Sequence, residues 1–292
     1  MPRYTPPMRI GLVLPLEREA SNGSPPWAIA VAERAEAMGL DSVWAYDHFF
    51  SNTPDEPPRM PVHEAWTIVS AVAARTSRVE IGQLVMCTAY RPPALLAKMA
   101  ATADAVSGGR ITLGLGAGWH FEEHRAFGYP FDHRFERFEE TLRIIAPLVR
   151  GDTVTFDGAY HRSDEAVLMP LARSIPILIA AFRPRMLRLT ARHADAWNTA
   201  WYGMPDDELR RAFVEMDAAL DVEGRDPATL RRTVVIDTRE PETNEGEGGV
   251  FVDDLPELFE AYEALGVDDV VLGFEAPNER SLDRLERVLR SR

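Results

Sequence analysis

The dipeptide Asp47-His48 follows a short apolar run, Asp41–Tyr46 (DSVWAY), which has the composition of a buried strand. An imidazole changes its charge near neutral pH, so His48 is a candidate general acid or base. A structural Asp-His pair that only fixes a loop is an equally good interpretation of the dipeptide alone. The choice depends on whether the fold gathers the ends of its strands at one site.

A glycine-rich loop, Gly114-Leu-Gly-Ala-Gly118, ends in Trp119. Glycines at the end of a strand allow another backbone or a flat ligand to come close. The loop lacks the G-x-G-x-x-G spacing of a dinucleotide site and lies far along the chain, which argues against a Rossmann domain. We therefore expect a flat ring to rest on this loop. A tight turn without any ligand is the alternative.

The segment His120-Phe-Glu-Glu-His124 has the H-x-x-E-H spacing of inverted zinc peptidases. That site needs a well-formed helix and a third ligand. Gly118 precedes the segment and Gly128 follows it closely, so there is room for barely two turns. We expect a short, solvated helix at the rim of a pocket and no metal. A metal hydrolase built on the two histidines is the competing hypothesis.

A possible anion site lies at the segment Ala180-Ala181-Phe182-Arg183, before the proline that opens a helix at Pro184. The first backbone N–H groups of a helix have no partner within it, and Arg183 adds a positive charge. Ordinary helix capping without a ligand explains the same pattern.

The composition limits the class of function. The chain has 32 Lys and Arg residues and 46 Asp and Glu residues, which gives a net charge of −14. This negative charge argues against a nucleic-acid partner. Cys87 is the only cysteine, so an intrachain disulfide is impossible and a reducing compartment is expected. The sequence shows no apolar run of membrane length and no signal-peptide core, so we predict a cytoplasmic protein without membrane association.

Strand and helix patterns alternate eight times along the 292 residues. Eight such units favour a closed (β/α)8 TIM barrel over an open sheet, and we predict a single domain over residues 1–292. A small hairpin, 154–162, is inserted between units four and five. The expected strands are Arg9–Pro15, Asp41–Tyr46, Val79–Val85, Ile111–Leu115, Ile175–Ala180, Ala196–Asn198, Thr233–Asp237 and Asp269–Leu272. The expected helices are Pro25–Met38, His63–Ala74, Pro92–Ser107, Phe135–Val149, Pro184–His193, Pro205–Val222, Asp254–Leu265 and Ser281–Leu289.

In this order and spacing, several short segments make the chain resemble the bacterial luciferase-like superfamily of flavin- and deazaflavin-dependent oxidoreductases. The resemblance covers nearly the whole chain and rests on 41–48 (DSVWAYDH), 90–98 (YRPPALLAK), 107–110 (SGGR), 115–119 (LGAGW), Glu123 with 126–128 (AFG), 137–140 (RFEE) and 194–198 (ADAWN). Ala180-Ala181 departs from the pattern, because many relatives have two glycines there.

The resemblance implies a cofactor in the wide mouth of the barrel, with the hairpin over the opening. It implies that the cofactor rests on Leu84–Val85, where related proteins often have a non-proline cis peptide. It further implies that Ala180, Ala181, Phe182 and Arg183 hold the cofactor's phosphate, and that His48 exchanges the proton beside the ring, with Trp119 as a wall of the substrate pocket. The other residues that it assigns to the cofactor are Asp47, Thr88, Gly116, Ala117, Gly118 and Trp119.

The resemblance thus implies an enzyme, with Asp47 and His48 as its catalytic pair, that transfers hydride between the deazaflavin coenzyme F420 and a small organic substrate. An FMN-dependent monooxygenase supplied by a separate reductase is the alternative, and a non-catalytic flavin-binding barrel is a third possibility. Family members often form homodimers. The substrate itself is not readable from the sequence.

Overall fold

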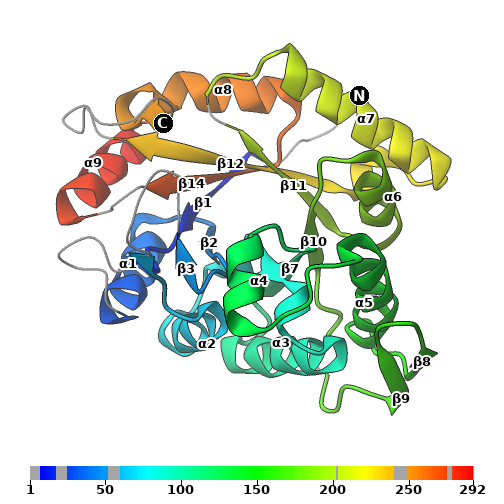
Figure 1. Ribbon diagram of the computed structural model, residues 1–292. Coiled ribbons are helices and arrows are strands. Elements are labelled where there is room, and N and C mark those ends of the chain that lie inside the picture. The colour runs from blue at the N-terminus through cyan, green and yellow to red at the C-terminus, as the bar shows by residue number, and fades with distance from the viewer. Residues whose placement is uncertain are drawn as a thin grey trace.

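The computed structural model describes residues 7–17, 25–51, 60–171, 173–201, 203–239, 249–274 and 278–291. Its main sheet is a closed barrel of eight parallel strands, because each strand pairs with the next along the chain, β7 pairs with β10, and β14 returns to pair with β1. Figure 1 shows the strands enclosed by the helices. The barrel strands are β1 (Arg9–Val13), β2 (Ser42–Ala45), β5 (Glu80–Gln83), β7 (Ile111–Gly116), β10 (Ile177–Ala180), β11 (Ala196–Trp201), β12 (Arg231–Arg239) and β14 (Asp269–Phe274).

The predicted (β/α)8 barrel is therefore confirmed, and the elements follow the predicted order. The third strand is shorter than predicted, because the extended chain breaks after Gln83 and resumes as β6 (Met86–Cys87). The helices are α1 (Pro25–Met38), α2 (Ala65–Arg75), α3 (Pro93–Ser107), α4 (Phe121–Phe127), α5 (Arg134–Leu148), α6 (Pro184–His193), α7 (Asp207–Val222), α8 (Leu255–Leu265) and α9 (Glu279–Arg290), with 3-10 turns η1 (Thr88–Tyr90), η2 (Pro227–Thr229) and η3 (Val252–Asp254). Three short strands lie outside the barrel strands: β3 (Phe50–Ser51) pairs with β4 (Met60–Pro61), and β13 (Val250–Phe251) pairs with the end of β12.

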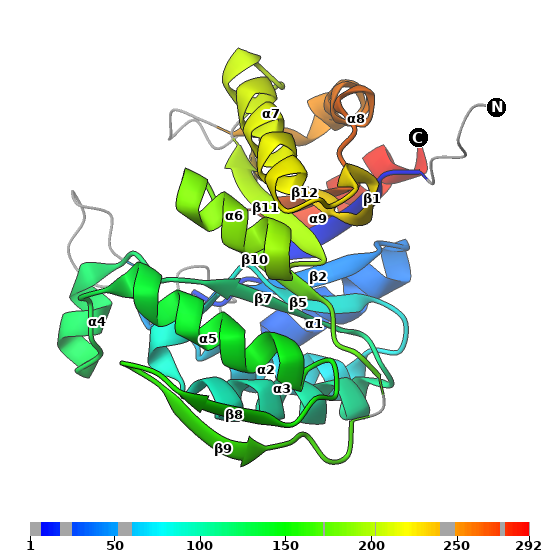
Figure 2. The ribbon, with the colours of Figure 1, turned by 90° about the vertical axis from the view of Figure 1, so that its right-hand side faces the viewer.

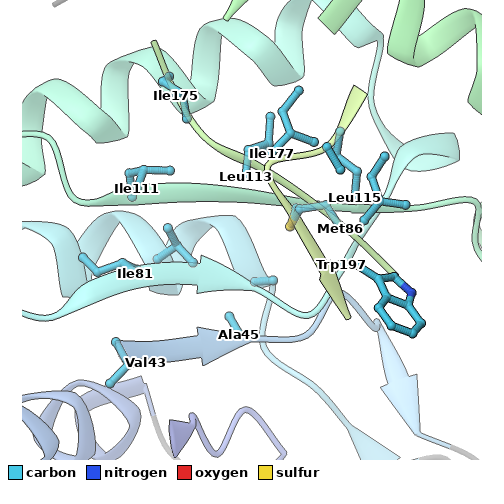
Figure 3. Close-up of a cluster of buried hydrophobic side chains, with 14 of the residues drawn as sticks. Val43, Ala45, Ile81, Met86, Ile111, Leu113, Leu115, Ile175, Ile177 and Trp197 are labelled. Atoms are coloured by element: carbon cyan, nitrogen blue, oxygen red, sulfur yellow. The ribbon is translucent and has the colours of Figure 1, made fainter. Parts of the chain in front are cut away.

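Two apolar cores follow from the alternation of side chains along the strands. The larger core lies between the barrel and its helices; Figure 3 shows part of it, with side chains such as Val43, Ile81 and Leu113 from neighbouring strands. The smaller core contains the buried indole of Trp44. A Cβ atom at Gly11 or Gly82 would collide with that indole, so the two glycines make room for it.

The strand starts carry a partly buried ionic network. Glu80 accepts hydrogen bonds from Arg9 Nη1 at 3.0 Å and Arg231 Nη2 at 2.8 Å, and Arg231 Nε lies 3.2 Å from Asp269 Oδ2. Burial alone would raise the pKa of Glu80, but the hydrogen bond and the charge of Arg231, with the charge of Arg9, hold that pKa at about 2. The network joins β1, β5, β12 and β14 at the end of the barrel opposite the mouth, where TIM barrels place residues that serve stability.

The predicted hairpin consists of β8 (Val154–Asp157) and β9 (Arg162–Ala166). Its tip is held by Glu140 of α5, whose carboxylate accepts hydrogen bonds from the backbone N–H groups of 159–161 at 2.7 to 2.9 Å. The hairpin therefore lies along the outer side of α5, as Figures 1 and 2 show. The expected position over the opening of the barrel is wrong.

No helix in the described ranges is both long and apolar enough to cross a membrane.

Glu80→Gln tests the network at the strand starts. The folded pKa of about 2 lies below the ordinary value of 4.5, so the ionised carboxylate contributes stability above pH 4.5 that is lost as the pH falls through about 2. The substitution should lower the free energy of unfolding at pH 7 by up to about 3 kcal/mol and flatten its decline below pH 4.5. Urea unfolding across pH measures both effects. Glu33→Gln, which breaks an exposed ion pair with Arg75, is the control; equal effects of the two substitutions would contradict the prediction.

Candidate functional site

The carboxyl ends of the barrel strands bring together side chains from three distant parts of the sequence. His48 follows β2, Leu84 and Val85 follow β5, and Trp119 follows β7. All eight strands are parallel, so these residues lie at the same end of the barrel, together with α4, which stands in front of β7 in Figure 1. This is the end at which TIM-barrel enzymes carry their active sites.

The side chain of His48 is held by a buried carboxylate. Its Nδ1 lies 2.8 Å from Glu123 Oε2, and Glu123, on α4, is fully buried. The same carboxylate accepts hydrogen bonds from the backbone N–H groups of Phe49 and Phe50 and from the Tyr90 hydroxyl. Burial opposes the charge of Glu123, but the hydrogen bond and the charge of His48, with the two backbone N–H groups, lower its pKa to about 2. Glu123 is therefore ionised at neutral pH.

His48 is also partly accessible at this end of the barrel. Its side chain is 26% exposed, and the centroid of its ring lies 5.4 Å from that of Trp119, which is 68% exposed. Glu123 occupies Nδ1, so Nε2 is the ring nitrogen left for proton exchange with a ligand. The structure thus brings His48 and Trp119 together, as expected.

Asp47 has a different environment from its neighbour. It is buried, and its carboxylate accepts two hydrogen bonds from Arg91, at 2.7 and 3.1 Å, and one from the backbone N–H of Cys87 at 3.0 Å. Arg91 also binds Glu64, whose side chain caps α2. Asp47 therefore links the end of β2 to β6 and α2. The catalytic role expected for Asp47 stays a prediction. Its contacts are those of a residue that holds the end of β2 in place.

The peptide bond between Leu84 and Val85 is cis, which confirms the expectation from the resemblance. Both side chains are partly exposed and pack on the core inside the barrel that contains Trp44. They provide an apolar surface at the top of the barrel interior.

The glycines in the second half of β7 and just after it make room for the neighbouring segment 83–87. A Cβ atom at Gly114 would collide with the carbonyl oxygen of Gln83. A Cβ at Gly116 would lie 2.5 Å from a methyl group of Val85, and one at Gly118 would lie 2.6 Å from the sulfur of Cys87. These contacts explain the glycines without a ligand. The assignment of Gly116, Ala117 and Gly118 to the cofactor therefore rests on the resemblance and stays a prediction.

Two hydrogen bonds from side chains of other segments hold the loop 116–118 in place. The hydroxyl of Thr88 donates to the carbonyl oxygen of Gly116 at 3.1 Å, and Arg134 Nη1 donates to that of Gly118 at 2.8 Å. Thr88 is buried, so its predicted contact with the cofactor also remains a prediction.

The H-x-x-E-H segment opens α4, a short helix capped by Gly128, as expected. The expected solvation holds for one face of the helix, which exposes Phe121, Arg125 and Phe127, but the opposite face is buried. His124 and Glu123 are fully buried and His120 is 8% exposed. His124 Nδ1 lies 2.7 Å from the carbonyl oxygen of Pro130, and its Nε2 lies 3.7 Å from Cys87 Sγ. Across the described ranges, no three His, Cys, Asp or Glu side chains are grouped so that they could hold a metal ion.

The segment 180–183 leads from β10 to the start of α6. Ala181 is buried, whereas Phe182 is 58% exposed and Arg183 is exposed. Arg183 is the N-cap residue of α6, and no side chain caps this helix. Its first-turn N–H groups, next to the guanidinium of Arg183, therefore offer an anion site.

Glu123 is the site residue whose role the sequence did not indicate. It belongs both to the H-x-x-E-H segment and to the family pattern, but neither suggested a contact with His48. The signal lay in its spacing from two histidines, which was interpreted only as a possible metal site.

Known proteins resemble the chain in sequence and in fold. The luciferase-like monooxygenase family matches residues 8–245. An F420-dependent glucose-6-phosphate dehydrogenase of Amycolatopsis mediterranei is 36% identical over 174 residues, 58% of this chain and 51% of the relative. An F420-dependent hydroxymycolic acid dehydrogenase of Mycobacterium tuberculosis is 34% identical over 207 residues, 69% of this chain and 56% of the relative. The chain thus spans about half the length of these two relatives.

Solved structures share the fold at low identity. An F420-dependent secondary alcohol dehydrogenase in complex with an F420-acetone adduct has a TM-score of 0.80 and 20% identity, over 97% of this chain and 98% of that one. The monooxygenase RslO1 from Streptomyces bottropensis has a TM-score of 0.75 and 18% identity, over 97% of each chain. At this identity the likeness establishes the barrel fold alone.

Asp47→Asn tests the anchoring contacts of Asp47. The amide removes the charge opposite Arg91, which is then left with an incomplete set of partners in a buried position. The free energy of unfolding should fall by about 3 kcal/mol, as measured by urea unfolding at pH 7. Asp132→Asn, which alters an exposed pair with Arg137, should change it by less than about 1 kcal/mol. An Asp47→Asn protein as stable as the control would show that the buried pair is not an anchor.

Proposed function

Because the chain belongs to the luciferase-like monooxygenase family, we propose that it is an oxidoreductase that transfers hydride between the deazaflavin coenzyme F420 and a small organic substrate. The observation that carries the proposal is the arrangement of His48. Its Nδ1 is bound by a buried carboxylate, and its side chain is 26% exposed at the carboxyl ends of the strands. The sequence relatives named for F420 support the choice of coenzyme.

The residues at the mouth fit a flat ring with an anionic tail. Leu84 and Val85 offer a partly exposed apolar surface, and Trp119 offers a largely exposed aromatic ring beside His48. The uncapped start of α6 and Arg183 fit a phosphate group. In this proposal Leu84 and Val85 contact the ring, 180–183 hold the phosphate, and Trp119 borders the substrate.

The bound coenzyme would supply the hydride chemistry. His48 would handle the proton: its Nε2 would accept the hydroxyl proton of an alcohol substrate on oxidation and would return a proton to the carbonyl oxygen in the reverse direction. Glu123 keeps the ring turned toward the mouth throughout, and Trp119 shields the reacting atoms from water on one side.

An FMN-dependent monooxygenase is the second candidate. It is favoured by the monooxygenases of the same family and fold, and it would need a separate reductase to supply reduced flavin. The coenzyme that binds decides between the two candidates.

The proposal extends to the assembly and the location of the enzyme. A groove lined by Trp66, Lys98 and Met99 lies between α2 and α3, and the neighbouring Leu95 and Val106 are more than half exposed. This apolar face supports a homodimer formed through these two helices.

The single, unpaired Cys87 supports a reducing compartment, and we propose the cytoplasm.

Anaerobic titration of the purified protein with F420 and with FMN, followed by absorbance and fluorescence, tests the proposal. We expect F420 to bind with micromolar affinity or better and FMN to bind at least tenfold more weakly.

His48→Ala should lower turnover of bound coenzyme by about 100-fold or more while changing the coenzyme dissociation constant less than threefold, because the proton acceptor is lost and the ring surface is kept. Binding of neither coenzyme, or unchanged turnover in His48→Ala, would contradict the proposal.

Arg183→Ala tests the phosphate site. Loss of a charge-assisted hydrogen bond should weaken binding of F420 about tenfold or more and leave binding of the phosphate-free deazaflavin unchanged. Arg188→Ala removes a charge from an exposed position on the same helix and should affect neither ligand. Equal weakening for both deazaflavins would place the phosphate elsewhere.

A further inference from the structure

We propose that Glu123 is the positioning residue of this site: its carboxylate holds His48 in the tautomer with the proton on Nδ1, and so makes Nε2 the proton acceptor. The inference concerns the imidazole itself and rests on the proposed function only for the identity of the reaction.

The tautomer follows from the hydrogen-bond partners of Glu123. Four groups lie at hydrogen-bond distance from its carboxylate, and three of them, the N–H groups of Phe49 and Phe50 and the hydroxyl of Tyr90, act as donors. The ionised carboxylate has no proton to give, so the fourth group, Nδ1 of His48, must be the donor. Neutral His48 therefore has an unprotonated Nε2.

The same carboxylate fixes the orientation of the ring. One oxygen binds the two N–H groups that directly follow His48, and the other binds the ring nitrogen. The carboxylate of Glu123 thus fixes both the imidazole of His48 and the backbone that follows it. Phe49 lies against Tyr90 and Phe127, with ring centroids 4.6 and 4.2 Å away, and these rings keep water from the carboxylate. Glu123 has no exposed surface.

Glu123 is also the nearest negative charge to the imidazole of His48: its Oε2 lies 2.8 Å from Nδ1. The other titratable groups near the ring are Tyr46 and His120, with ring centroids 6.2 and 5.9 Å away. Asp47, the preceding residue, is neutralised by Arg91. Glu123 is therefore the one anion among the described neighbours of His48 that has no arginine partner.

Glu123→Gln, compared with Glu122→Gln, tests the inference. Both substitutions remove one negative charge from α4, but Glu122 forms an exposed ion pair with Arg125. The first readout needs no coenzyme: ¹⁵N NMR of the imidazole shows which nitrogen carries the proton. We expect the Nδ1–H tautomer in the unsubstituted protein and in Glu122→Gln, and a mixture of tautomers in Glu123→Gln, because an amide can also donate to Nδ1.

The second readout is kinetic. Glu123→Gln should lower kcat about 10- to 100-fold with little change in KM, as is typical when the group that orients a functional histidine is removed. Glu123→Asp keeps the charge and should restore part of the rate. It also serves as the test protein if Glu123→Gln does not fold, and a weaker preference for Nδ1–H is then expected.

An unchanged tautomer in Glu123→Gln, or equal rate losses in the two Gln variants, would overturn the positioning role. The two proposals fail separately. A tautomer change in a protein that binds neither F420 nor FMN would support the role of Glu123 and contradict the proposed function.

Discussion

The close approach of residues 83–87 to β7 is the constraint on which the mouth of the barrel depends. Alternate glycines, at 114, 116 and 118, receive alternate residues of the neighbouring segment: Gln83, Val85 and Cys87. At Gly114 the collision would involve a backbone carbonyl, which cannot turn away as a side chain can. Larger residues at these positions would therefore separate the two segments. The spacing brings Leu84 and Val85 to the top of the barrel interior, next to the loop that carries Trp119.

Two buried carboxylates then determine how His48 is presented. Asp47 and Glu123 both accept backbone N–H groups, so both anchor loops, but their cationic partners differ. Asp47 has the guanidinium of Arg91, which is always protonated and which it shares with Glu64. Glu123 has no arginine partner; its Oε2 lies 2.8 Å from Nδ1 of His48 and 3.8 Å from Nδ1 of His120. The orientation of His48 therefore depends on Glu123, while Asp47 is held by Arg91 beside the same histidine.

The features that could be predicted from the sequence are those encoded by local patterns. The alternation of strands and helices indicates the barrel, and Asp47-His48 is placed at the mouth because it directly follows a strand. The cis peptide at Leu84–Val85 was predicted from the family resemblance. The failures share one cause, which is that contacts between distant segments leave no local pattern. Glycines beside a ligand and glycines beside another strand look identical in sequence. The sequence predicts the exposed face of α4 but not its buried face, because the residues that bury Glu123 lie more than 30 positions away.

The ionic network at the strand starts and the site at the strand ends divide the tasks of the barrel between its two ends. Four side chains neutralise one another in a partly buried cluster that joins four strands: Arg9, Glu80, Arg231 and Asp269. None of them belongs to the loops of the mouth. A change in those loops therefore leaves the closure of the barrel intact, whereas a change at 114–118 or at Glu123 alters contacts that belong to both the fold and the site. The position of His48 thus depends on β2, β7 and α4, whereas the closure of the barrel depends on the strand starts.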